Sequence, residues 1–136
     1  MIIPALLAAM LTGYAPAQLA CSGADPAITK ASVQSVSSNG DLTYRTVAVT
    51  VTNLGSAGQH GDLLQSVDVY QDNNKVDQKG VPPLRPGQSA TVLYQFKRSS
   101  EARRNSTRLD FRMDVQSAVP GPADCNPAND HLRLNA

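Results

Sequence analysis

Tryptophan is absent from the sequence, aromatic residues make up only 4% of it, and charged residues make up 17%. Basic and acidic residues nearly balance, giving a formal net charge of +1 at pH 7, which excludes a general electrostatic attraction to nucleic acid. A low charged fraction with abundant Ser, Thr, Asn and Gln is typical of an all-β extracellular module. The 136 residues suffice for one domain whose single core folds without a metal.

A long hydrophobic run is also missing. The apolar run from Ile2 to Leu11 is shorter than the roughly 20 residues that a membrane-spanning helix needs. It is typical of the hydrophobic region of a secretory signal peptide, although no Lys or Arg precedes it. Ala15-Pro16-Ala17 supplies the small residues that signal peptidase accepts, so we expect cleavage before Gln18. The sequence therefore predicts an exported protein, periplasmic or secreted, with a signal peptide (1–17), a lead-in (18–26) and one domain (27–136).

The only two cysteines, Cys21 and Cys125, stand near opposite ends of the domain. In an oxidising compartment two thiols in one small domain usually pair. A disulfide closing a loop of roughly 100 residues contributes about 4 kcal/mol in the chain-entropy model. The alternative is lipidation of Cys21, because residues 18–21 resemble a lipoprotein processing site, although Gln18 stands where an apolar residue is usual. Lipidation would make the protein an outer-membrane lipoprotein, and it is the one route to a membrane that we expect.

Helical periodicity is absent, and a period of two runs through the domain. The clearest case alternates Val47, Val49 and Val51 with threonines on the other face. Similar patterns predict seven strands, at 27–36, 43–53, 63–72, 75–79, 88–97, 107–116 and 131–135. We expect the following side chains to face the core: Ile28, Val33, Val36, Val67, Val69, Ala90, Val92, Tyr94, Phe96, Leu109, Phe111, Met113, Val115, Leu132 and Leu134.

Turn signals separate these runs. Asn39-Gly40 predicts a type I′ hairpin, residues 72–75 predict a second tight turn, and Pro86-Gly87 predicts a third. The fold class that follows is all-β, an immunoglobulin-like antiparallel β-sandwich of about seven strands. The antibody-type core tryptophan is missing, and neither cysteine lies on the second or sixth strand.

Three motifs in order make the pattern specific: Val-Thr-Asn-x-Gly at 51–55, Leu-x-Pro-Gly-Gln at 84–88, and a polar Asn/Asp turn before the last strand. Together they resemble a CARDB-type domain, a bacterial cell-adhesion-related module of the immunoglobulin-like class, over about residues 27–135. The resemblance implies an exported domain of a kind that often occurs as repeats. Only one copy is present here.

Half of the 12 basic residues gather in one stretch of the sequence. Against Glu101 and Asp110 they give residues 97–112 a net charge of +4. One interpretation is a surface that binds an anionic glycan, lipopolysaccharide or an acidic protein; the other is a solvated loop. Nucleic acid is not expected, because no aromatic residue is interleaved in the loop to stack on bases. The six basic residues are Lys97, Arg98, Arg103, Arg104, Arg108 and Arg112.

The stretch before the last strand offers oxygen ligands of the kind that calcium prefers. They are Asp124, Asn126, Asn129 and Asp130, but their spacing matches no known calcium loop, and turn formation explains the same residues. This region is therefore a weak calcium candidate, and no other metal is expected.

No catalytic residue is expected. His60 and His131 are the only histidines, and no serine is arranged with them as a triad. Asp110 and Asp114 alternate with arginines, which indicates ion pairing on a solvated strand face rather than acid–base catalysis.

We therefore expect a non-enzymatic binding or adhesion module of the bacterial cell envelope that needs no cofactor and contacts a protein or an anionic glycan. The alternative is a structural accessory subunit of a periplasmic or outer-membrane assembly. Such a subunit would pair with its partner through an open sheet edge, at 75–79 or 131–135.

Overall fold

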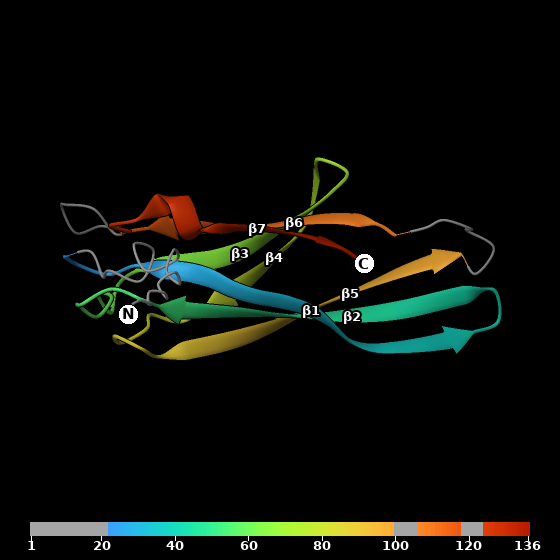
Figure 1. Ribbon diagram of the computed structural model, residues 1–136, viewed down its shortest axis with the longest axis horizontal. Helices are drawn as coiled ribbons and strands as arrows, with labels where there is room; N and C mark the ends of the chain where they lie inside the picture. The colour runs from blue at the N-terminus through green and yellow to red at the C-terminus, as the bar shows by residue number, and fades with distance from the viewer. Residues whose placement is uncertain (1–21, 100–105, 118–123) are drawn as a thin grey trace, which may run out of the picture.

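A computed structural model describes residues 22–99, 106–117 and 124–136, and within them the protein is an all-β sandwich (Figure 1). Two antiparallel sheets form its layers, one with the order β1-β2-β5 and one with the order β4-β3-β6-β7. This confirms the predicted fold class and all seven predicted strands, with small shifts at their ends. The elements are β1 (Pro26–Asn39), β2 (Leu42–Asn53), β3 (Leu64–Gln71), β4 (Asn74–Val81), β5 (Ser89–Ser99), β6 (Arg108–Gln116), the short 3-10 helix η1 (Pro127–Asn129) and β7 (His131–Asn135).

The core lies between the two sheets and is filled by every second side chain of the strands. In β2, Val47, Val49 and Val51 are fully buried, as the alternation with threonine predicts. β6 contributes Leu109 and Phe111 in the same way. Leu132 and Leu134 of β7 are partly buried against this core, which confirms that the last strand belongs to the sandwich. Other buried members of the core are Ile28, Val67, Val69, Val81, Leu84, Tyr94, Phe96 and Met113.

The second half of β1 corrects one prediction. Val33 and Val36 were expected in the core, but 37% and 54% of their surfaces are exposed. β1 and β2 continue to their hairpin turn at one end of the molecule, past the ends of β3 and β7 (Figure 1). Val33 lies opposite Val47 of β2, which is fully buried. The exposure of these valines therefore reflects their place on β1, the edge strand of the three-stranded sheet. The expected irregularity in β1 is confirmed by register shifts at Ile28/Lys30 and Val33/Ser35.

Two of the three predicted turns, those at residues 72–75 and at Pro86-Gly87, are confirmed. Asp72 and Asn73 both have positive φ, 50° and 71°, which gives the β3–β4 hairpin the type I′ geometry. Gly87 has φ of 79° and Gln88 N–H donates to Arg85 C=O at 2.9 Å, as a type II turn at Pro86-Gly87 requires.

The first hairpin turn differs from the prediction. Asn39 pairs with Leu42, so the two turn residues are Gly40 and Asp41 rather than Asn39 and Gly40. Only Gly40, with φ of 65°, has positive φ, so the type I′ assignment for Asn39-Gly40 is wrong. Glycine serves this position because it has no Cβ to oppose that conformation.

The Val-Thr-Asn-x-Gly motif is explained by one fully buried amide, that of Asn53. Its Oδ1 accepts hydrogen bonds from the backbone N–H groups of Asp25 and Gly55, each at 2.9 Å. Its Nδ2 donates to the carbonyls of Ala57 at 2.9 Å and Leu84 at 3.0 Å. Asn53 therefore ties together three separate segments at the end of β2.

Gly55 of the same motif lies where the chain has no room for a side chain. A Cβ at this position would lie 2.0 Å from the carbonyl oxygen of Gly23 and 2.7 Å from the backbone nitrogen of Asp25. The segment before β1 thus passes directly over the end of β2, and this close approach explains why a glycine stands at position 55.

Candidate functional site

Charged side chains gather on the outer face of the four-stranded sheet, and the strand pattern explains why. Leu109, Phe111 and Met113 of β6 face the core, so the residues between them face outward. β7 then lies beside β6 in a register that sets Arg133 opposite Asp110 and His131 opposite Arg112. We call Arg108, Arg112, His131 and Arg133 the basic face.

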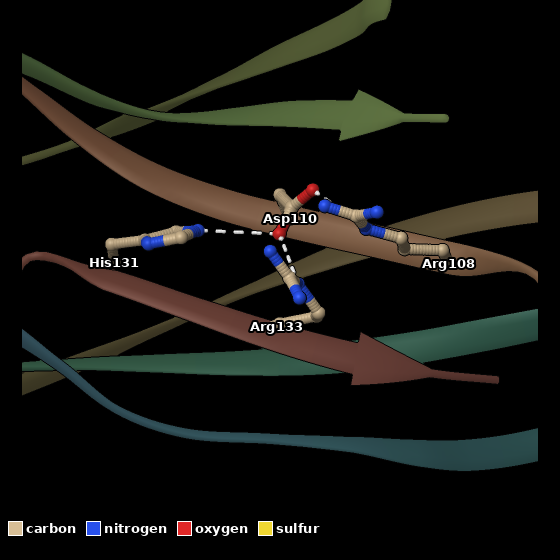
Figure 2. Close-up of polar contacts among 4 residues, drawn as sticks. All are labelled: Arg108, Asp110, His131 and Arg133. Carbon is tan, nitrogen blue, oxygen red and sulfur yellow. Dashed lines mark hydrogen bonds and ion pairs between the residues drawn. The ribbon is translucent and has the colours of Figure 1, made fainter. Parts of the chain in front are cut away.

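Three of these side chains converge on the carboxylate of Asp110 (Figure 2). Arg133 Nε donates a hydrogen bond to Oδ1 at 3.0 Å, and His131 Nε2 lies 3.2 Å from the same oxygen. Arg108 Nε lies 3.6 Å from Oδ2, which is an ion pair without a hydrogen bond. One carboxylate therefore pairs with basic side chains from both β6 and β7.

Asp110 is fully buried even though it lies on the outer face, which corrects the expectation of a solvated position. Burial by itself raises the pKa of its carboxyl. The hydrogen bonds from Arg133 and His131 and the charge of Arg108 outweigh burial and lower the pKa below its usual value. Asp110 is therefore a charged carboxylate that orients the side chains above it.

The cations of this face are much more exposed than the anions beneath them. The side chains of Arg108 and Arg133 are 41% and 52% exposed, whereas that of Asp110 is 1% exposed. Asp68 of β3, 8% exposed, is likewise covered and lies 3.4 Å from Lys75 Nζ. In these ion pairs the more exposed partner is therefore the cation, and the counter-charge lies below it.

Arg112 is held differently from the other arginines of the basic face. Its guanidinium carbon lies 4.5 Å from the centroid of the Tyr70 ring, a cation–π arrangement between β6 and β3. A guanidinium stacked on an aromatic ring keeps its N–H groups directed outward, where they can pair with a carboxylate or phosphate.

The predicted basic cluster is only partly brought together. Arg108 and Arg112 lie on the basic face, but Lys97 and Arg98 are on β5 in the other sheet. Arg103 and Arg104 lie outside the described residues. Sequence reasoning missed His131 and Arg133, whose signal was the outward alternation in the last strand combined with its pairing to β6.

The weak calcium candidates lie in a second cluster, where the loop before β7 meets the segment before β1. Asn129 Nδ2 donates to Asp25 Oδ2 at 2.9 Å, and Asn126 N–H donates to Asp124 Oδ1 at 3.0 Å. Asp25, a buried residue, was not among the predicted ligands. Asp130 contributes its backbone carbonyl to Met113 N–H at 2.8 Å, which fastens the loop to β6.

Burial and then neighbouring carboxyl groups raise the pKa of Asp124 and Asp130, because both disfavour the negatively charged form. Burial, followed by the like charges of Asp25 and Asp130, raises the pKa of Asp124 to about 6, against the lowering effect of the Asn126 N–H. Burial also raises the pKa of Asp130, against the lowering effects of a backbone hydrogen bond and His131. Asp25 and Asp124 lie close enough for a hydrogen bond between their side chains when one is protonated.

Cys125 lies in the same loop, beside the segment that follows Cys21 in the sequence. Its N–H donates to Ala24 C=O at 2.8 Å, and its Cβ lies 3.8 Å from where a Cβ on Gly23 would be. This position is the one that the predicted Cys21–Cys125 disulfide needs. Cys21, the expected signal peptide and its cleavage site lie outside the described residues, so the disulfide and the export signal stay predictions.

The two histidines lie in different surroundings. His60 Nδ1 lies 3.7 Å from Asp62 on an exposed loop, and His131 lies on the open outer face of the sheet. A surface depression of about 360 Å³ lies elsewhere, lined by Tyr44, Gln71, Tyr94, Gln95, Phe96 and Lys97. Neither histidine lines this depression.

A family model described as CARDB matches residues 26–128. The chain belongs to the CARDB family. The match begins with β1 and ends within η1, so it includes Arg108 and Arg112 but not the two β7 residues of the basic face. No curated protein and no solved structure matches the chain. In the part of the chain that the structure describes, we find no helix with the length and hydrophobicity to cross a membrane.

Proposed function

We propose that this CARDB domain is a non-enzymatic, exported binding module of the bacterial cell envelope, and that its basic face contacts an anionic glycan. The observation that carries the proposal is the convergence of Arg108, Arg133 and His131 on one buried carboxylate. A single buried charge holds several exposed cations in fixed positions. Ordered cations lose less conformational entropy on binding than free ones do, which favours their use as a recognition surface.

The chemistry of the face fits carboxylates or phosphates spaced along a polymer. Arginine recognises both groups through paired N–H donors, and the guanidinium of Arg112 lies over the Tyr70 ring. A uronic-acid glycan supplies carboxylates, and lipopolysaccharide supplies phosphates. We expect contact with the glycan to be weak for each sugar and to depend on several contacts at once.

The test is binding of the mature protein to polygalacturonate, to lipopolysaccharide and to neutral dextran, measured by biolayer interferometry at two salt concentrations. Arg112→Gln and Arg133→Gln should each weaken binding to the anionic polymers by about three- to tenfold, since a charge-assisted hydrogen bond is worth about 1 kcal/mol or more. Arg85→Gln is the matched control, because Arg85 is an exposed arginine in the turn between β4 and β5.

Binding to dextran as strong as to the anionic polymers would contradict the proposal, as would equal losses in all three variants. Circular dichroism of each variant would show whether the sandwich is intact, so that a folding defect is not read as lost binding. A preference between polygalacturonate and lipopolysaccharide would identify carboxylate or phosphate as the recognised group.

A second candidate function follows from the open sheet edges. Within the described residues, β4 pairs only with β3 and β7 pairs only with β6, so each leaves one edge of backbone groups unpaired. A partner strand could add there. Binding to a protein partner that resists high salt and survives both arginine substitutions would favour this structural role over glycan contact.

A further inference from the structure

Three buried side-chain oxygens have no hydrogen-bond partner where the segment before β1 meets the loop before β7. They are Asp25 Oδ1, Asp124 Oδ2 and Asn129 Oδ1. Asp25 itself is only 3% exposed. Buried acceptors without donors are costly, and native proteins rarely leave several of them together.

The contacts between these residues show that the oxygens belong to one cluster. Asn129 Nδ2 donates to Asp25 Oδ2 at 2.9 Å, which leaves Oδ1 of Asp25 as the unpaired oxygen of that carboxylate. Asn126 N–H occupies Asp124 Oδ1 at 3.0 Å and leaves Oδ2 unpaired in the same way. The Cys125 N–H bond to Ala24 C=O, at 2.8 Å, fixes the two backbone segments against each other. Two carboxylates and one amide thus each have one buried oxygen without a hydrogen-bond partner.

We propose that Asp25, Asp124 and Asn129 bind a calcium ion that joins the start of the sandwich to the loop before its last strand. Calcium takes carboxylate and amide oxygens in flexible geometry and completes its shell with backbone carbonyls and water. A cation bound by these residues would give partners to oxygens that otherwise have none.

The ligand set argues for calcium over transition metals. Among the described residues, no group of three or more His, Cys, Asp or Glu side chains could hold a metal, so the proposed site depends on the amide oxygen of Asn129 as its third ligand. The proposed set has two such carboxylates and an amide oxygen, which is hard-ligand chemistry. Magnesium fits less well, because it demands near-octahedral geometry and dehydrates reluctantly.

The first measurement is the Tm of the oxidised mature protein with and without about 5 mM CaCl₂. Extracellular modules bind calcium with dissociation constants of about 10⁻⁴–10⁻³ M. At that concentration mass action raises Tm by several degrees, roughly 3–10 °C for a domain of this size. The same concentration of MgCl₂ should raise it less. Isothermal titration of the wild type should show a single calcium site.

Asp25→Asn and Asp124→Asn are the decisive variants, and Asp41→Asn is their matched control. Asp41 lies exposed in the β1–β2 turn, at the other end of the molecule. Both site variants should lose the calcium-dependent rise in Tm, and the control should keep it. Each variant is also compared with the wild type in calcium-free buffer, so that loss of the calcium response is distinguished from a general loss of stability.

An unchanged wild-type Tm together with no heat of calcium binding would overturn the proposal. A calcium response that persists in both site variants would also overturn it, since the ion would then bind elsewhere. If one variant fails to fold in calcium-free buffer, the other variant and the wild-type titration still decide the question.

Discussion

Replacing Asn53 by alanine tests the explanation of the Val-Thr-Asn-x-Gly motif. The substitution removes four hydrogen bonds, to the N–H groups of Asp25 and Gly55 and to the carbonyls of Ala57 and Leu84. Each is worth about 0.5–1.5 kcal/mol net, and backbone groups left buried without a partner cost more. Allowing for water entering part of the space, we expect the free energy of unfolding to fall by about 3–4 kcal/mol.

Urea denaturation followed by circular dichroism measures this loss, and thermal melting should show Tm lower by roughly 10–20 °C. Asn74→Ala, at an exposed position at the start of β4, is the matched control and should change stability by about 0.5 kcal/mol or less. Asn53→Asp keeps the acceptor oxygen but turns a charge toward two carbonyls, so it should be as harmful as alanine at neutral pH. A loss below about 1 kcal/mol for Asn53→Ala would refute the view that this amide organises the end of β2.

Three further predictions concern packing and pH. Gly55→Ala should lower the free energy of unfolding by about 3 kcal/mol or more, because the new Cβ would meet the Gly23 carbonyl. Gly61→Ala is the control, since a Cβ there meets open space and should leave stability nearly unchanged. Thermal melting of the two variants distinguishes these outcomes. The Asp110 carboxyl has a folded pKa below its unfolded value of 3.8, so its stabilisation is present above pH 3.8 and is lost as pH falls through the folded pKa. Urea titrations of wild type and Asp110→Asn should therefore converge on acidification, and a constant difference between pH 7 and pH 2 would contradict this account. Val49→Thr should cost about 1–3 kcal/mol because it buries a hydroxyl in the core, whereas Val36→Thr, at a position 54% exposed, should cost about 0.5 kcal/mol or less in the same assay.

The strands could be predicted from sequence because each carries its own alternation of apolar and polar side chains. β2 shows this most clearly, since its valines are all buried and Thr46, Thr50 and Thr52 lie on the other face. The same reasoning failed for Val33 and Val36, because alternation says which face a side chain takes, not whether its strand lies at the edge of the sheet. The turn at Gly40 was misplaced by one residue because Asn39 and Asp41 both suit a turn, and only strand register distinguishes them.

The candidate sites were harder to predict because they depend on pairing between distant segments. Arg108 and Arg112 could be found from their outward positions in one strand. Their association with His131 and Arg133 required the register of β6 against β7. Asp25 lies 99 residues before Asp124 in the sequence, and nothing local to either residue indicates that they meet. The burial of Asp110 could not be predicted from its own strand either, because the side chains of His131 and Arg133 on the neighbouring strand contact it.

The register shifts in β1 also bear on how the protein avoids aggregation. The second half of β1 belongs to an edge strand and its side chains are largely exposed, an arrangement that can recruit other chains into a growing sheet. Its shift between Val33 and Ser35 interrupts the regular ladder of backbone groups, and serines stand at Ser35, Ser37 and Ser38. A second chain would find neither a continuous row of donors and acceptors nor an apolar stripe to pack on. The same irregularity that weakens the first strand locally should therefore keep the protein in solution at concentrations where a straight, valine-rich edge would form fibrils.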